Sequence, residues 1–70
     1  MNELNLLTVV AVIDDTNEYG LLRGQVGTIV EVLAPNRFEV EFSDNQGTTY
    51  AMAVMRGDQL MALHYEPHSA

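Results

Sequence analysis

The sequence predicts an all-β fold made of five short strands. Its clearest strand pattern runs from Phe38 to Phe42, where large apolar residues alternate strictly with glutamates. Alternation with a period of two places one set of side chains on each face of a strand. The other strand-forming runs are rich in β-branched residues and are separated by clusters of Gly, Asn, Asp and Pro, which are turn formers.

Length and composition indicate one small globular domain. We expect residues 1–70 to form a single domain, with the folded part from about residue 8 to 63 and flexible ends. The apolar fraction of 47% is ordinary for a globular chain. Because cysteine is absent, neither a disulfide nor a thiolate metal site can stabilise the fold.

The N-terminal run, residues 1–13, is apolar but does not resemble a targeting segment. It lacks the basic start and the small-residue cleavage site of a signal peptide, and it is too short to span a bilayer. We therefore expect a cytoplasmic protein with no membrane insertion.

The chain is strongly acidic. Ten acidic residues stand against three arginines and no lysine, which gives a formal net charge of −7. A surface of this sign repels nucleic acid phosphates and anionic membranes, and it attracts basic partners. The alternative explanation of the charge is solubility alone.

The first third of the chain predicts one strand and one long loop. Residues 8–13 are rich in β-branched side chains and form the first strand, while residues 14–24 are dominated by turn formers. Within this loop, Tyr19, Leu21 and Leu22 are expected to fold back over one mouth of the fold.

Residues 26–33 and 38–42 predict the second and third strands, and residue parity limits how they pair. A four-residue connection would mix charge into the core, so we expect a three-residue loop, Pro35 to Arg37. This register buries Val30 and Val32 and leaves Ile29 and Leu33 outside. It also sets Glu31 opposite Glu41. The expected pairs are Ala34 with Phe38, Val32 with Val40, and Val30 with Phe42.

The second hairpin is predicted to turn at residues 44–47, with Gly47 in the left-handed conformation, so that Ser43 pairs with Thr48. Residues 56–59 predict a tight turn with one turn of 3₁₀ helix, residues 60–63 predict a fifth strand, and a frayed tail follows. On the fourth strand the residues expected to face the core are Thr49, Ala51, Ala53 and Met55, and those expected outside are Tyr50, Met52 and Val54.

Five short strands with a long first loop and a tight turn before the last strand follow the order of a small five-stranded SH3-like barrel. Phe42 is expected to be fully buried in it. The predicted core is Val10, Val12, Val26, Val30, Val32, Phe38, Val40, Phe42, Ala51, Ala53 and Leu60.

Residues 23–32, followed by residues 38–42 and by Tyr50-Ala51, resemble a family of very short, uncharacterised bacterial proteins, cyanobacterial ones included. The resemblance covers about residues 8–63, and the family carries a domain-of-unknown-function label. It implies an SH3-like fold and no activity.

Two more distant resemblances involve the same glycines. Gly24-x-x-Gly27-x-Ile29 is similar to the glycine pattern of KOW modules in ribosomal proteins and transcription factors. Gly27-Thr28-Ile29 with a Val-x-Phe strand is similar to small SH3-like subunits of photosystem I and the photosynthetic NDH complex. KOW modules that bind RNA use basic side chains, and the matching positions here are acidic or neutral, so RNA binding is not carried over.

No motif indicates catalysis or a cofactor. Asp14, Asp15, Asn17 and Glu18 could hold a hard cation, but Tyr19 occupies the place of a further ligand, and a solvated turn is the expected reading. His64 and His68 have helical metal spacing, which Pro67 interrupts. Because no Ser, Cys or Lys lies in a nucleophile motif, we expect a protein that is not an enzyme and holds no metal.

The outer sheet face is the candidate binding site, with the residues Glu31, Glu39, Glu41, Tyr50, Met52 and Val54. Acids beside exposed apolar residues suit a protein–protein interaction module, with a basic partner or a second copy as a homodimer. An antitoxin or immunity-like protein that masks a nuclease is one example. The alternatives are an accessory or structural subunit of a larger complex, for example a photosynthetic one, and a KOW-like nucleic-acid binder, which the charge disfavours. Leu4, Leu6 and Leu7 could instead cover this face from within the chain.

Overall fold

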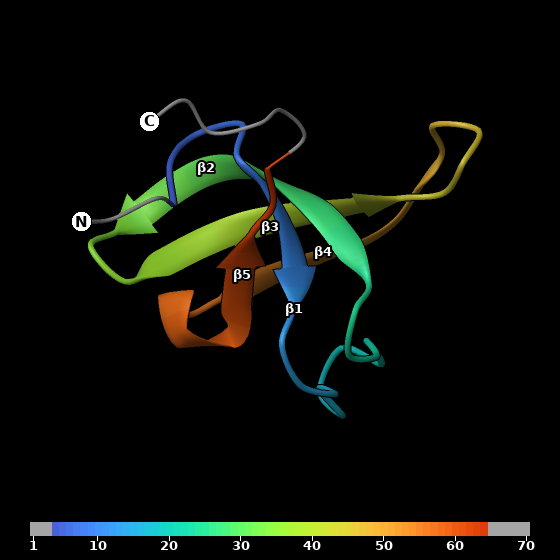
Figure 1. The fold of residues 1–70 in the computed structure, drawn as a ribbon, viewed down its shortest axis with the longest axis horizontal. Coiled ribbons are helices and arrows are strands. Elements are labelled where there is room, and N and C mark those ends of the chain that lie inside the picture. The colour runs from blue at the N-terminus through green and yellow to red at the C-terminus, as the bar shows by residue number, and fades with distance from the viewer. Residues whose placement is uncertain (1–3, 65–70) are drawn as a thin grey trace.

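The computed structural model describes residues 4–64, which form one curled sheet of five antiparallel strands (Figure 1). The strand order across the sheet is β4-β3-β2-β1-β5, so β4 and β5 are its edges. The predicted all-β fold with five strands is confirmed. The elements are β1 (Val9–Val12), β2 (Val26–Ala34), β3 (Arg37–Ser43), β4 (Thr49–Met55), the single 3₁₀ turn η1 (Gly57–Gln59) and β5 (Leu60–Ala62).

The architecture is the SH3-like barrel that the order of elements predicts. A long connection follows β1, and η1 precedes β5, which returns to pair with β1. Within residues 4–64 no helix has the length and apolar character needed to cross a membrane. The core inside the curled sheet contains Val10, Val12, Leu21, Ile29, Phe38, Val40, Phe42, Ala53, Met55 and Leu60, with Leu4 and Ala51 packed against it.

On β2 the predicted core residues are wrong. Val26 and Val32 are 44% and 46% exposed and Val30 is only partly buried, whereas Ile29, which was expected outside, is completely buried. Gly27 is buried beside it, so the inward face of β2 begins with Gly27 and Ile29.

The cause is the register of the β2–β3 hairpin. Ala34 pairs with Arg37, so the turn contains two residues and not three. Moving away from the turn, the register shifts twice, and each shift adds one residue on β2. Together with the shorter turn, the two shifts displace Ile29 by three residues from its predicted pairing. An odd displacement exchanges the two faces of a strand, so Ile29 takes the inward place opposite Val40. The shorter turn and the shift nearer to it set Glu31 opposite Glu39, not opposite Glu41.

The β3–β4 hairpin also differs from the predicted pairs, with a milder result. Phe38 pairs with Met55 and Phe42 with Ala51, which is displaced by two residues from the predicted register. A displacement of two keeps every side chain on its face, so Ala53 and Met55 are buried as expected. Near the turn, Ser43 pairs with Thr49 after a register shift, and Thr49 is exposed. Gly47 has the predicted left-handed backbone, with φ of +83°.

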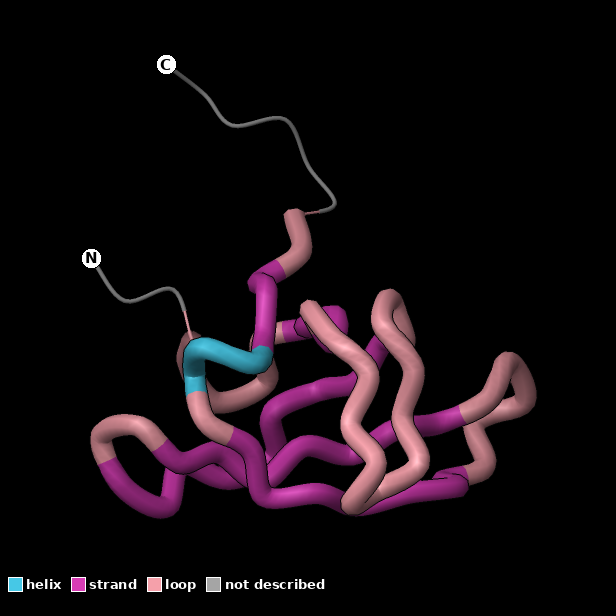
Figure 2. The backbone as a smooth tube through the Cα atoms, turned by 90° about the horizontal axis from the view of Figure 1, so that it is seen from below, coloured by secondary structure: helices cyan, strands magenta, loops and turns pink. Residues whose placement is uncertain are grey.

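The long connection between β1 and β2 folds back over the core, as predicted. Thr16 and Leu21 pair through two backbone hydrogen bonds, and Leu21 is buried while Leu22 is exposed. The Tyr19 hydroxyl reaches the carbonyl oxygen of Val54 on β4, at 3.3 Å. Seen from below, this connection lies in front of the strands (Figure 2).

Candidate functional site

The candidate site is the outer face of β2, β3 and β4, which we call the acid–apolar face and define by the six residues predicted above. Its three apolar members are close to half exposed: Tyr50 at 49%, Met52 at 47% and Val54 at 43%. Glu31 is exposed, while Glu39 and Glu41 are partly buried.

Strand pairing arranges five of the six residues in two rows across the sheet. Val54 lies opposite Glu39, and Glu39 lies opposite Glu31. In the next row Met52 lies opposite Glu41. Each acid on β3 therefore has an exposed apolar neighbour on β4, because directly opposed side chains share a face.

Glu31 and Glu39 form a like-charged pair with nothing in the described chain to neutralise it. Across residues 4–64 the one ion pair joins Arg56 to Asp58 at 3.1 Å, at the start of η1. Like charges directly opposed on neighbouring strands destabilise a sheet by up to about 1 kcal/mol. The fold therefore retains an unfavourable contact that a cation from outside would relieve.

Glu41 differs from the other two acids because it has a partner inside the chain. Its Oε2 accepts a hydrogen bond from the hydroxyl of Thr49 on β4. This bond holds the Glu41 carboxylate toward the turn end of the second hairpin, so Glu31 and Glu39 are the freer acids of the face.

Tyr50 is exposed but anchored. It lies at the register shift of β4, its ring is 6.4 Å from that of buried Phe42, and its hydroxyl accepts a hydrogen bond from Gln25 Nε2 at 2.9 Å. Because these contacts already hold the ring, a partner that contacts it causes little further loss of side-chain entropy. Tyr50 therefore stands at the border of the face, apart from the acid rows.

The described part of the N-terminal segment leaves the acid–apolar face open. Leu4 packs against the core, next to the η1 glycine Gly57, while Leu6 and Leu7 keep exposed side chains. The Leu7 N–H donates to the carbonyl of Ile29, which continues the line of β1 along β2. The alternative in which these three leucines cover the face is not met within residues 4–64.

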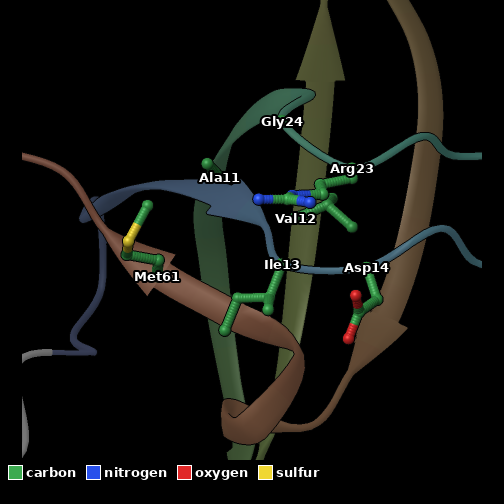
Figure 3. A pocket seen from close by; sticks show the side chains of 7 residues that line it. All are labelled: Ala11, Val12, Ile13, Asp14, Arg23, Gly24 and Met61. Carbon is green, nitrogen blue, oxygen red and sulfur yellow. The ribbon is translucent and has the colours of Figure 1, made fainter.

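Two hollows lie on other parts of the surface. The larger, an open depression of about 430 Å³, is bordered by β1, the start of the long connection and β5 (Figure 3). Arg23 and Asp14 both line it, and their charged ends point in different directions. The smaller, about 210 Å³, lies between Asp14, Asp15 and the Arg56–Asp58 pair, and Thr16 also lines it. The hydroxyl of Thr16 is buried and has no hydrogen-bond partner in the described chain.

The acids of the long connection do not gather into a metal site. Within residues 4–64 no three His, Asp or Glu side chains lie close enough together to hold a metal ion. Asp15 instead accepts the backbone N–H of Arg23 at 2.7 Å, which is the contact of a structural loop. His64 is exposed at the end of the described chain, and His68 lies outside the described residues.

Comparison with protein families gives one match. The model of the family described as "Domain of unknown function (DUF4926)" matches residues 6–62, which is most of the chain. The chain belongs to this family. No curated protein matches it, and no solved structure does. The description of the DUF4926 family names no activity.

Two features of this DUF4926 domain were not predicted from its sequence. Tyr19 and Gln25, both from the long connection, hydrogen-bond to β4 at the candidate site. The Arg23 hollow, on another part of the surface, joins segments distant in sequence. Neither has a local sequence signal, since both depend on how the connection folds over the sheet.

Proposed function

We propose that this protein is a non-catalytic protein–protein interaction module that binds a basic partner through the acid–apolar face. The partner contributes arginine or lysine side chains to Glu31 and Glu39 and an apolar surface to Met52 and Val54. An antitoxin or immunity-like protein that masks a basic nuclease would have this chemistry.

The observation that carries the proposal is the Glu31–Glu39 pair. Glu31 and Glu39 are directly paired across β2 and β3, and neither forms an ion pair with a cation of the described chain. A guanidinium placed between them would remove the repulsion and add charge-assisted hydrogen bonds. The exposed side chains of β4 beside the pair supply apolar area that such contacts alone lack.

The chemical class of the partner follows from the overall charge. A chain of net charge −7 without lysine attracts a basic protein and repels the phosphates of a nucleic acid. The likeness to KOW modules and the role of an accessory subunit in a photosynthetic complex have no specific observation in their favour, and they stay predictions. Bacterial origin and a cytoplasmic location also stay predictions.

The test compares two double variants with the same net charge. Glu31→Gln with Glu39→Gln removes two charges from the face, and Asp14→Asn with Glu18→Gln removes two charges from the long connection. An arginine-rich peptide serves as the probe, and its affinity is measured by calorimetry at low and at high salt. We expect the face variant to weaken binding about tenfold or more and the loop variant to change it little.

Equal losses in the two variants would show that the peptide responds to net charge alone, which would overturn the proposal. Circular dichroism spectra that match the parent protein establish that each variant is folded. Binding by the parent protein must also weaken with salt, since exposed charge pairs are screened over a Debye length of about 8 Å at physiological ionic strength.

A further inference from the structure

β4 is an edge strand without the usual protection of an edge. Its seven residues, Thr49–Met55, contain no charged residue and no proline. Natural sheets commonly protect such edges with lysine, proline or short strands, because unpaired N–H and C=O groups can pair with another chain. The opposite edge strand, β5, is only three residues long. The two edges of this sheet therefore differ in kind.

The backbone of β4 offers hydrogen-bonding groups away from β3. In an antiparallel ladder the N–H and C=O of one residue point to the same side, and the side alternates along the strand. The Val54 carbonyl accepts the Tyr19 hydroxyl, which comes from the long connection and not from β3. By alternation, the N–H and C=O of Met52 also point outward. Outside the sheet ladder, no described residue hydrogen-bonds to the Met52 backbone.

We propose that a second copy of the chain pairs with β4 through antiparallel backbone hydrogen bonds centred on Met52. In this arrangement Met52 meets Met52 of the partner subunit and Ala51 meets the partner's Ala53. The outermost pair, Tyr50 with the partner's Val54, forms only if the Tyr19 hydroxyl shares or releases the Val54 carbonyl that it contacts at 3.3 Å. The small alanines let the two strands approach on the inner side, and the exposed Met52 side chains cover each other on the outer side.

Charge distinguishes this edge contact from a contact between two faces. With edge pairing, Glu41 is separated from Glu41 of the partner subunit by three strand spacings, roughly 14 Å. That distance exceeds the Debye length of about 8 Å at physiological ionic strength. Face-to-face packing would place the two sheets only about 10 Å apart, with the glutamate side chains of both sheets in the space between them. A chain of net charge −7 can therefore associate with itself along β4 and not through the acids of β2 and β3.

The same reasoning selects a second copy over a basic strand as the occupant of the edge. β4 has no acid of its own, so a basic strand would find no counter-charge on it. The inference goes beyond the proposed function: the dimer leaves Glu31 and Glu39 open to a basic partner, although it uses Met52, which that partner would also contact. The two proposals can fail separately. Dimer formation depends on the concentration of this protein, whereas binding of a basic partner depends on the concentration of added basic peptide.

The experiment uses sedimentation equilibrium of the full chain from about 10 μM to about 1 mM, a range that spans weak dissociation constants. We expect the parent protein to shift from monomer to dimer. Met52→Pro removes the outward N–H and no ladder bond to β3, which an edge strand tolerates. Met52→Ala keeps that N–H and removes the side chain. We expect the dissociation constant of the dimer to be at least tenfold higher for Met52→Pro than for Met52→Ala.

Met61→Ala on β5 is the matched control, since Met61 is as exposed as Met52 but lies on the other edge. It should leave the dimer unchanged. A parent protein that stays monomeric throughout the range, or a folded Met52→Pro variant that dimerises like the parent, would overturn the inference.

Hydrogen exchange of the parent protein keeps the proposal testable should Met52→Pro fail to fold. The Met52 amide should exchange rapidly in dilute solution and slow down about tenfold or more as the concentration rises. Exchange that is independent of concentration, or that slows only with added arginine-rich peptide, contradicts pairing with a second copy. The variant with Glu31→Gln and Glu39→Gln should retain the dimer.

Discussion

The two hairpins that share β3 hold their register in different ways. Between β2 and β3 the register shifts twice within a few residues of a two-residue turn, whereas between β3 and β4 five successive pairs are regular before one shift near the turn. Both differ from the simplest pairing of the sequence. In the first, residues exchange faces and Ile29 becomes core, but in the second the faces are preserved. The face of a side chain depends on whether a displacement is odd or even, not on its size.

The largest expected effect tests the exchange of faces on β2. Ile29→Ala should lower the free energy of unfolding by about 2–5 kcal/mol, because Ile29 is completely buried. Val32→Ala, on the same strand, should cost less than about 1 kcal/mol, because Val32 is close to half exposed. Urea unfolding of both variants measures the difference. A larger loss of unfolding free energy for Val32→Ala than for Ile29→Ala would support the uninterrupted register and contradict the bulges.

Gly27→Ala tests how tightly the buried end of the first hairpin is packed. An added Cβ would lie 2.7 Å from Val40 Cγ1 and 2.9 Å from the Glu41 carbonyl oxygen, both on β3. The strands would have to separate, and we expect a loss of about 1–3 kcal/mol in unfolding free energy. Gly27 does not have a positive φ, so the loss would come from crowding. Thermal unfolding provides the measurement, and an unchanged melting temperature would refute the close approach.

Glu31→Arg tests the like-charged pair that the bulges create. With arginine opposite Glu39, the repulsion becomes an attraction, and stability should rise by about 0.2–1 kcal/mol. Glu18→Arg, which makes the same charge change in the exposed long connection, is the control for net charge. Chemical denaturation at low and high salt compares the two variants. If both variants gain equally, the pairing of Glu31 with Glu39 has no energetic role.

The smallest effect concerns the open edge of the second hairpin. Tyr19→Phe removes the hydroxyl that bonds to the Val54 carbonyl at 3.3 Å, an exposed and long hydrogen bond. We expect stability to change by less than about 0.5 kcal/mol. Hydrogen exchange of the long connection should nevertheless become faster, because this contact ties it to β4. A destabilisation above about 1 kcal/mol would show that the contact supports the core.

Much of the fold follows from local patterns in the sequence. The alternation from Phe38 to Phe42 fixes the inward face of β3, and Gly47 marks the left-handed position of its turn. The register of β2 does not follow, because Val30, Val32 and Ile29 are equally apolar and satisfy either face. What decides between them is the close approach that Gly27 allows to Val40, a contact between residues distant in sequence.

The outward placement of the β4 residues was predicted better than the core residues of β2. Met52 and Val54 were placed outside from a register that was wrong by two residues, and they are outside because two is even. The pairing of Glu31 was wrong, since it depends on the bulges of β2. The contacts of Tyr19 and Gln25 with β4 could not be predicted, because a loop rich in turn formers carries no periodic signal.

The pairing of β1 with β5 has a consequence for the speed of folding. The three strands β2, β3 and β4 form a meander in which each strand pairs with its neighbour in the chain, so they can assemble through short loops. Val10, by contrast, pairs with Ala62, near the other end of the described chain. Closing so long a loop costs chain entropy before any contact compensates for it. The bond from the Gly57 N–H to Asn36 Oδ1 joins η1 to the turn of the first hairpin and so places the start of β5. Once the meander has formed, this bond reduces the number of conformations that the chain must sample before β5 pairs with β1.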